Sequence, residues 1–120
     1  MKKDGQLLMG VSGKEEKRRI IRFFLQLKAR YSVKGGKANW GECIIMNASR
    51  KGMGIKFLAR DKIIIGSTVH LKIAIPGEFK PPSVMGVLMW MGKEEDHFIG
   101  GIELTEELDE IIWAKLTKID

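Results

Sequence analysis

The strongest constraint on the fold is a strict alternation of apolar and polar side chains in the middle of the chain. From position 69 to position 75 every second residue is a branched apolar one, namely Val69, Leu71, Ile73 and Ile75. Because successive side chains of a strand point to opposite faces of a sheet, this pattern predicts a strand with one buried face. The chain is therefore expected to fold around a β-sheet.

Five other segments are predicted as strands from their alternation or their apolar content. They cover residues 24–33, 38–46, 54–60, 83–92 and 97–104. Turn sequences separate several of them, such as KGGK at 34–37 and PGEFKPP at 76–82, whose prolines cannot donate a ladder hydrogen bond. Six short antiparallel strands favour a closed barrel, because closure leaves no edge strand bare.

The end of the chain changes to helical spacing. Apolar residues in 105–120 recur three or four positions apart, and Thr105 is the predicted N-cap. The strand at 83–92 is apolar on both faces, so this helix is expected to cover its outer side. Core positions are predicted for the tryptophans, which are Trp40, Trp90 and Trp113. The predicted fold class is mostly β: a six-stranded antiparallel β-barrel with a C-terminal α-helix and a flexible N-terminal arm.

The positive charge of the chain is concentrated near its N-terminus. Residues 1–37 contain eleven basic and three acidic residues, whereas the rest of the chain contains ten basic and twelve acidic ones. We expect residues 1–16 to be a flexible arm and residues 17–120 to form the barrel domain with its helix. A basic arm suggests an anionic partner, although a solvated tail would have the same composition.

Composition argues against several classes of protein. The one cysteine, Cys43, cannot form an internal disulfide, and no Cys/His cluster has the spacing of a metal site. No apolar run reaches the roughly 20 residues that cross a membrane, and the N-terminus lacks the apolar segment of a secretory signal. A cytoplasmic protein without membrane insertion is expected. His70 and His97 have no acid, thiol or second histidine at a useful spacing, so we predict neither an enzyme nor a cofactor.

Two short elements carry chemistry that a binding site could use. The first is KRRIIR, residues 17–22, where Arg18 and Arg22 lie four positions apart. In a helix or in a strand this spacing places both guanidinium groups on one side and Arg19 on another. Two convergent guanidinium groups can hold phosphate oxygens, or the N7 and O6 edge of guanine, in bidentate hydrogen bonds.

The second element is NASRKGMG, residues 47–54. Asn47 and Ser49 lie two positions apart at the end of a predicted strand, so they are expected on one face, where both can hydrogen-bond a base or a phosphate. Gly52 and Gly54 allow a tight turn and a close approach of the backbone to a ligand. A basic linker and an Asx-type hairpin would explain the two elements separately. The residues alone therefore predict an anion site, with a guanine nucleotide as one candidate ligand.

Together, the two elements resemble the motifs of the PilZ domain family. The family's Arg-x-x-x-Arg element is matched by Arg18 and Arg22, and its (Asp/Asn)-x-Ser-x-x-Gly element by Asn47, Ser49 and Gly52. The resemblance extends over about residues 17–115. It implies a small receptor for cyclic di-GMP, a bacterial second messenger, which these five residues would bind from the arm and from a corner between two strands.

The resemblance also singles out positions beside the motifs. Lys17 occupies a position that in this family influences whether one ligand or a stacked pair binds, and Lys51 stands where a small residue is frequent and could add a phosphate contact. Lys17, Arg19 and Lys51 are therefore additional candidate contacts. Ile20 and Ile21 replace an aromatic residue and a proline that family members often carry, so the path of the arm is expected to differ.

Two alternatives keep the same fold. A basic barrel can bind single-stranded nucleic acid. We do not expect this partner, because the charge lies in the arm and the aromatic residues are predicted to be buried. A ligand-independent adaptor is the other alternative, although such members of the family typically lack motif residues that this chain keeps. A receptor of 120 residues without a separate output domain is expected to act through a downstream protein partner.

Overall fold

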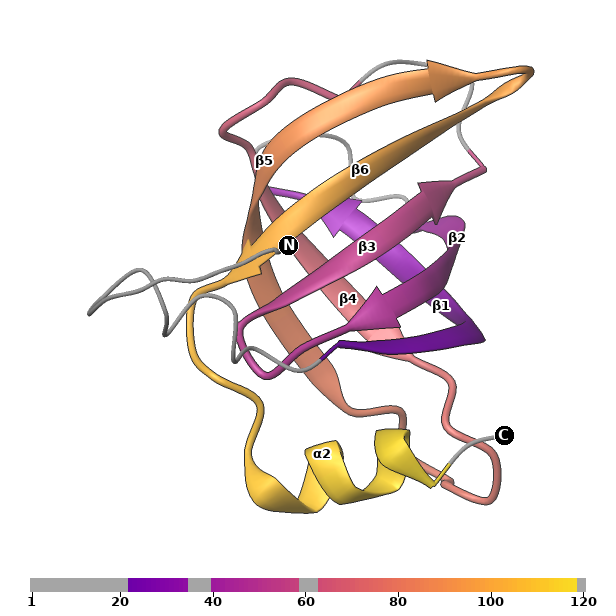
Figure 1. Ribbon diagram of the computed structural model, residues 1–120, viewed down its shortest axis with the longest axis vertical. Coiled ribbons are helices and arrows are strands. Elements are labelled where there is room, and N and C mark those ends of the chain that lie inside the picture. Colours follow the sequence, from indigo (N-terminus) through magenta and orange to yellow (C-terminus); the bar gives the residue numbers. More distant parts are fainter. Residues whose placement is uncertain (1–21, 35–39, 59–62, 119–120) are drawn as a thin grey trace, which may run out of the picture.

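The computed structural model describes residues 22–34, 40–58 and 63–118. In this part of the chain six antiparallel strands close into a barrel, and a helix follows them (Figure 1). The elements are β1 (Phe23–Val33), β2 (Gly41–Ala48), β3 (Gly52–Phe57), β4 (Thr68–Ile73), β5 (Ser83–Glu94), β6 (His97–Leu104) and α2 (Glu110–Thr117). Their order around the barrel is β1-β2-β3-β6-β5-β4, and β4 pairs with β1 to close it. The predicted fold class is confirmed, while the predicted arm lies outside the described residues.

The alternation at 69–75 has the predicted consequence. Val69, Leu71 and Ile73 are fully buried, and Ile75 is 7% exposed. Inward side chains of the other strands, such as Phe57, join them in one core that fills the barrel. A binding site is therefore to be sought on the outer surface.

The boundaries of two strands differ from the prediction near the second motif. β2 runs to Ala48 rather than ending at Met46, and β3 begins at Gly52 rather than at Gly54. The backbone N–H of Ser49 donates to the carbonyl of Gly52 at 2.8 Å, which closes the connection after very few residues. The motif is a tight corner between two strands.

The prediction of Thr105 as the N-cap of the helix is wrong. The helix begins after Asp109, whose carboxylate accepts a hydrogen bond from the backbone N–H of Ile112 at 2.8 Å. Thr105 is instead tied to β5, because its backbone N–H and its hydroxyl both donate to the carbonyl of Met85 at 2.9 and 3.0 Å. Residues 105–109 thus form a connector between β6 and α2.

Within the described residues no helix is both long and apolar enough to cross a membrane.

The prediction that the helix covers the outer side of β5 is also wrong. In Figure 1, α2 lies beneath one end of the barrel. There Trp113 packs on Phe23 with 5.3 Å between the ring centroids, and Leu116 is buried. Met89 and Trp90 on β5 remain 52% and 48% exposed. The outer side of β5 is therefore open to solvent.

Candidate functional site

A strip of backbone without side chains lies on the outer face of β3 and β6. The two strands pair antiparallel, with Gly54 opposite Gly101 and Gly52 opposite Glu103. A Cβ at Gly52 would stand 2.9 Å from the carbonyl oxygen of Ile102, closer than side chains tolerate. The three glycines, Gly52, Gly54 and Gly101, are referred to below as the glycine strip, and none of them places a side chain on this face.

A bulge in β5 turns Trp90 onto the glycine strip. Leu88 is fully buried and pairs with Ile102, whereas Trp90, two positions later, pairs with Gly101, because the register shifts between them. One extra residue in a strand reverses the face on which the following side chains lie. The indole rests on Gly101 so closely that a Cβ there would stand 2.7 Å from its Cδ1 and Cε2 atoms. The prediction of Trp90 as a core residue is therefore wrong, and this ring is a functional candidate that the alternation pattern concealed.

A bulge in β2 acts in the same way on Asn47. Ile45 is fully buried and pairs with Ile55, whereas Asn47 pairs with Gly54, because the register shifts between Ile45 and Asn47. The amide lies over the other glycine of the strip, since a Cβ at Gly54 would stand 2.5 Å from its Nδ2 atom. Asn47 Oδ1 accepts a hydrogen bond of 2.6 Å from Nη1 of Arg22, which stands just before β1. Arg22, the second arginine of the Arg-x-x-x-Arg element, thus contacts Asn47, the first residue of the Asn-x-Ser-x-x-Gly element.

Ser49 shapes the corner between β2 and β3. It is 2% exposed, and its hydroxyl oxygen accepts hydrogen bonds from the backbone N–H groups of Gly52 and Lys51 at 3.1 and 3.3 Å. The hydroxyl also lies 3.4 Å from the carbonyl oxygen of Gly52, to which it donates. Because these bonds satisfy polar groups inside the turn, Ser49 fixes the backbone from which its neighbours project.

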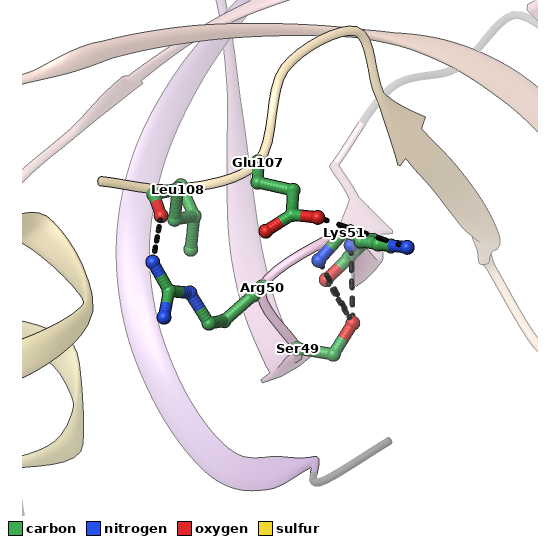
Figure 2. A network of polar contacts seen from close by, with 6 residues as sticks. Ser49, Arg50, Lys51, Glu107 and Leu108 are labelled. Atoms are coloured by element: carbon green, nitrogen blue, oxygen red, sulfur yellow. Dashed lines mark hydrogen bonds and ion pairs between the residues drawn. The ribbon is translucent and has the colours of Figure 1, made fainter. Parts of the chain in front are cut away.

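Arg50 and Lys51 bind the corner to the connector of residues 105–109, as Figure 2 shows. The Arg50 guanidinium donates to the carbonyl of Leu108 at 3.1 Å, and the backbone N–H of Leu108 donates to the carbonyl of Arg50 at 2.9 Å. The ammonium of Lys51 stands 3.7 Å from a carboxylate oxygen of Glu107, and both side chains are more than half exposed. Nothing in the sequence pattern indicated these contacts, which link the motif to the start of α2.

These features surround one pocket of about 450 Å³ on the outer face of the barrel. Six of the residues whose chemistry the sequence singled out line it, namely Arg22, Asn47, Ser49, Lys51, Gly52 and Gly54. Lys17, Arg18 and Arg19 lie outside the described residues, so their place at the site stays a prediction. Sequence reasoning missed Trp90 and Glu103, which also line the pocket.

The pocket combines several kinds of recognition chemistry. Arg22 and Lys51 supply positive charge, Asn47 supplies an amide that can donate and accept, and Trp90 supplies an exposed aromatic face. Glu103 adds a carboxylate at the far edge of the strip. Such a set suits a ligand that has both an anionic group and an aromatic ring with polar edges.

Cys43 lies inside the barrel, away from this pocket. It is 1% exposed, and burial raises the pKa of its thiol to about 12, because the thiolate would lose its hydration. This environment is that of a packed thiol rather than of a nucleophile. In the described ranges no three His, Cys, Asp or Glu side chains come together in a group that could hold a metal ion.

The chain was compared with protein families, with curated proteins and with solved structures. Residues 16–119 match the PilZ domain family, a family of cyclic di-GMP-binding receptors. The solved structure of the Bacillus subtilis inhibitor of motility (MotI/DgrA) is similar, with a TM-score of 0.62 and 15% identity over 83% of this chain and 48% of that one. This chain thus spans about half the length of that protein, and at this identity the likeness concerns the fold. No curated protein matches. Since the family match covers nearly all of the sequence, the chain belongs to the PilZ domain family.

Proposed function

We propose that this chain is a receptor that binds cyclic di-GMP in the pocket over the glycine strip. The observation that carries the proposal is the 2.6 Å hydrogen bond from Arg22 to Asn47, which joins the two motifs at one site. Cyclic di-GMP has two guanines on a doubly anionic ring, so it needs both cations and base contacts. The bound form would then be recognised by a protein partner.

The residues around the pocket have separate roles in this proposal. Arg22, together with Arg18, would bind phosphate oxygens or the N7 and O6 edge of a guanine, and Lys51 would add a phosphate contact. Trp90 offers a face on which a guanine can stack. Ser49 contributes through the turn that its hydroxyl holds, because three backbone groups already engage it.

Titration calorimetry with cyclic di-GMP tests the proposal. Hydrogen bonds to a charged group contribute about 1.5–3 kcal/mol each. Arg22→Ala and Arg18→Ala are therefore expected to weaken binding about tenfold or more. Arg30→Ala is the matched control, because Arg30 lies on β1 opposite Glu42 and Lys72 and outside the pocket. Affinities unchanged in both motif variants would contradict the assignment, as would an equal loss in the control.

A second candidate function is binding of single-stranded nucleic acid, and the exposure of Trp90 favours it. Burial of the aromatic residues, which the sequence predicts and which would disfavour this function, does not apply to Trp90, because its ring is 48% exposed. Exposed aromatic rings beside cations are a common platform for unpaired bases. A competition assay separates the candidates: a random oligonucleotide at physiological salt should fail to displace labelled cyclic di-GMP.

A further inference from the structure

Glu103 is the one acidic side chain among the described residues that line the pocket. It lies on β6, two positions after Gly101, so its side chain leaves the strand on the same face as the glycine strip. It stands opposite Gly52, which has no side chain to screen it. Within the described residues Glu103 makes neither an ion pair nor a side-chain hydrogen bond, so its carboxylate is free to accept one from a ligand.

A carboxylate in this place is unfavourable for binding an anion unless the ligand brings donors to it. An ionised carboxylate only accepts hydrogen bonds, and it repels a phosphodiester. Among the common bases, guanine alone presents two adjacent N–H donors, N1–H and the 2-amino group, on its Watson–Crick edge. Adenine and cytosine present one donor beside an acceptor, and uracil presents one N–H between two carbonyl oxygens. A carboxylate therefore fits guanine and no other common base in a bidentate way.

We propose that Glu103 is the residue that selects guanine, its two carboxylate oxygens accepting hydrogen bonds from N1–H and the 2-amino group of a base stacked on Trp90. The proposal rests on the proposed function, since it assigns one part of the same ligand to one part of the same pocket. Trp90 covers Gly101, and Glu103 follows on the same face of β6, so the ring and the carboxylate are placed to meet the face and the edge of one base. Arg22 and Lys51 line the same pocket and are left for the phosphate.

Calorimetry with three cyclic dinucleotides tests the selection: cyclic di-GMP, cyclic di-IMP, which lacks the 2-amino group, and cyclic di-AMP. The wild-type chain should bind cyclic di-GMP about tenfold or more tightly than cyclic di-IMP, because a site built for a donor rejects an analogue without it. Glu103→Gln should weaken cyclic di-GMP about tenfold and leave cyclic di-IMP nearly unchanged, so that the preference shrinks. Glu106→Gln is the control, since it removes the same charge from an exposed connector residue outside the pocket.

The sign of the effect decides the question. If Glu103 were only a solvated surface residue, removing its charge would leave the binding of a dianion unchanged or strengthen it. Either result in Glu103→Gln overturns the proposal, and so does a wild-type chain that binds cyclic di-GMP and cyclic di-IMP equally. Should cyclic di-GMP bind, and Arg22→Ala abolish it, while Glu103→Gln keeps the preference, the proposed function stands and this inference fails. A wild-type chain that binds none of the three ligands overturns both.

Discussion

Replacing Gly101 by alanine would test whether the indole on the glycine strip takes part in binding. The new Cβ would stand 2.7 Å from Cδ1 and Cε2 of Trp90, so the ring would have to lift away from the sheet. Trp90 is 48% exposed and can swing into solvent, and the backbone of Gly101 does not need a positive φ. We therefore expect the barrel to fold. Its free energy of unfolding should fall by less than about 1–3 kcal/mol, which is the cost of overpacking a closed core.

Binding should suffer more than stability. A base stacked on an aromatic side chain contributes about 1–3 kcal/mol, which corresponds to about 5- to 150-fold in affinity. A displaced indole would lose all or most of that contribution. We expect Gly101→Ala to weaken cyclic di-GMP within this range while the midpoint of urea unfolding changes little.

The assay is calorimetry on Gly101→Ala, Trp90→Ala, the double variant and a glycine control. Gly92→Ala is the matched control, because a Cβ at Gly92 would meet nothing within 4 Å and Gly92 does not line the pocket. If the glycine acts only through the indole, the double variant should bind no more weakly than Trp90→Ala. Wild-type affinity in Gly101→Ala, or fully additive losses in the double variant, would refute the reasoning.

Two further predictions concern stability. Ser49→Ala should lower the free energy of unfolding by about 1–3 kcal/mol in urea denaturation, because the backbone N–H groups of Lys51 and Gly52 lose a buried acceptor; a change within error would show that the backbone closes the corner unaided. For Cys43 the folded-state pKa of about 12 lies above the unfolded value of 9.0, so the folded state holds the proton longer. Unfolding free energy should fall as the pH rises from about 9 to 12, more steeply than in Cys43→Ala, and equal slopes would contradict the assigned pKa.

Much of the barrel could be predicted because its pattern is local. Period-two alternation at 69–75 indicates a strand with one buried face, and the structure has a strand there whose apolar side chains lie in the core. The start of the helix was predicted wrongly because Thr105 and Asp109 are both good N-cap residues. The choice between them depends on the carbonyl of Met85 on β5, which engages Thr105. That contact spans 20 positions and leaves no trace in the local sequence.

The candidate site was predictable only where its residues belong to a motif. Asn47, Ser49 and Gly52 are close in sequence, and Arg22 belongs to a recognisable pair, so their assignment did not need the fold. Trp90 and Glu103 join the site through the pairing of β5 with β6 and of β6 with β3, which no local pattern reveals. A strict alternation even gave the wrong face for Trp90, because it assumed a strand without a bulge.

The two bulges explain how Asn47 and Trp90 come to line the pocket on the outer face of the barrel. By strict alternation Asn47 would share the face of the buried Ile45, and Trp90 that of the buried Leu88, so both polar amide and indole would point into the core. The register shift in β2 places Asn47 on the outer face, and the register shift in β5 does the same for Trp90. The two side chains then flank the same pair of opposed glycines from opposite sides, since β3 and β6 lie between β2 and β5.

The spacing of the second motif follows from the same geometry. Asn47 must be the last outward residue of the bulged strand to meet Arg22, and Ser49 must follow the strand end to accept from the corner's backbone N–H groups. Gly52 must pair opposite Glu103, where a Cβ would press on a carbonyl oxygen. The positions between Ser49 and Gly52 are then free to face the connector, which is where Arg50 is bonded. One short corner therefore holds the pocket-lining residues Asn47 and Gly52 and also contacts the connector that precedes α2.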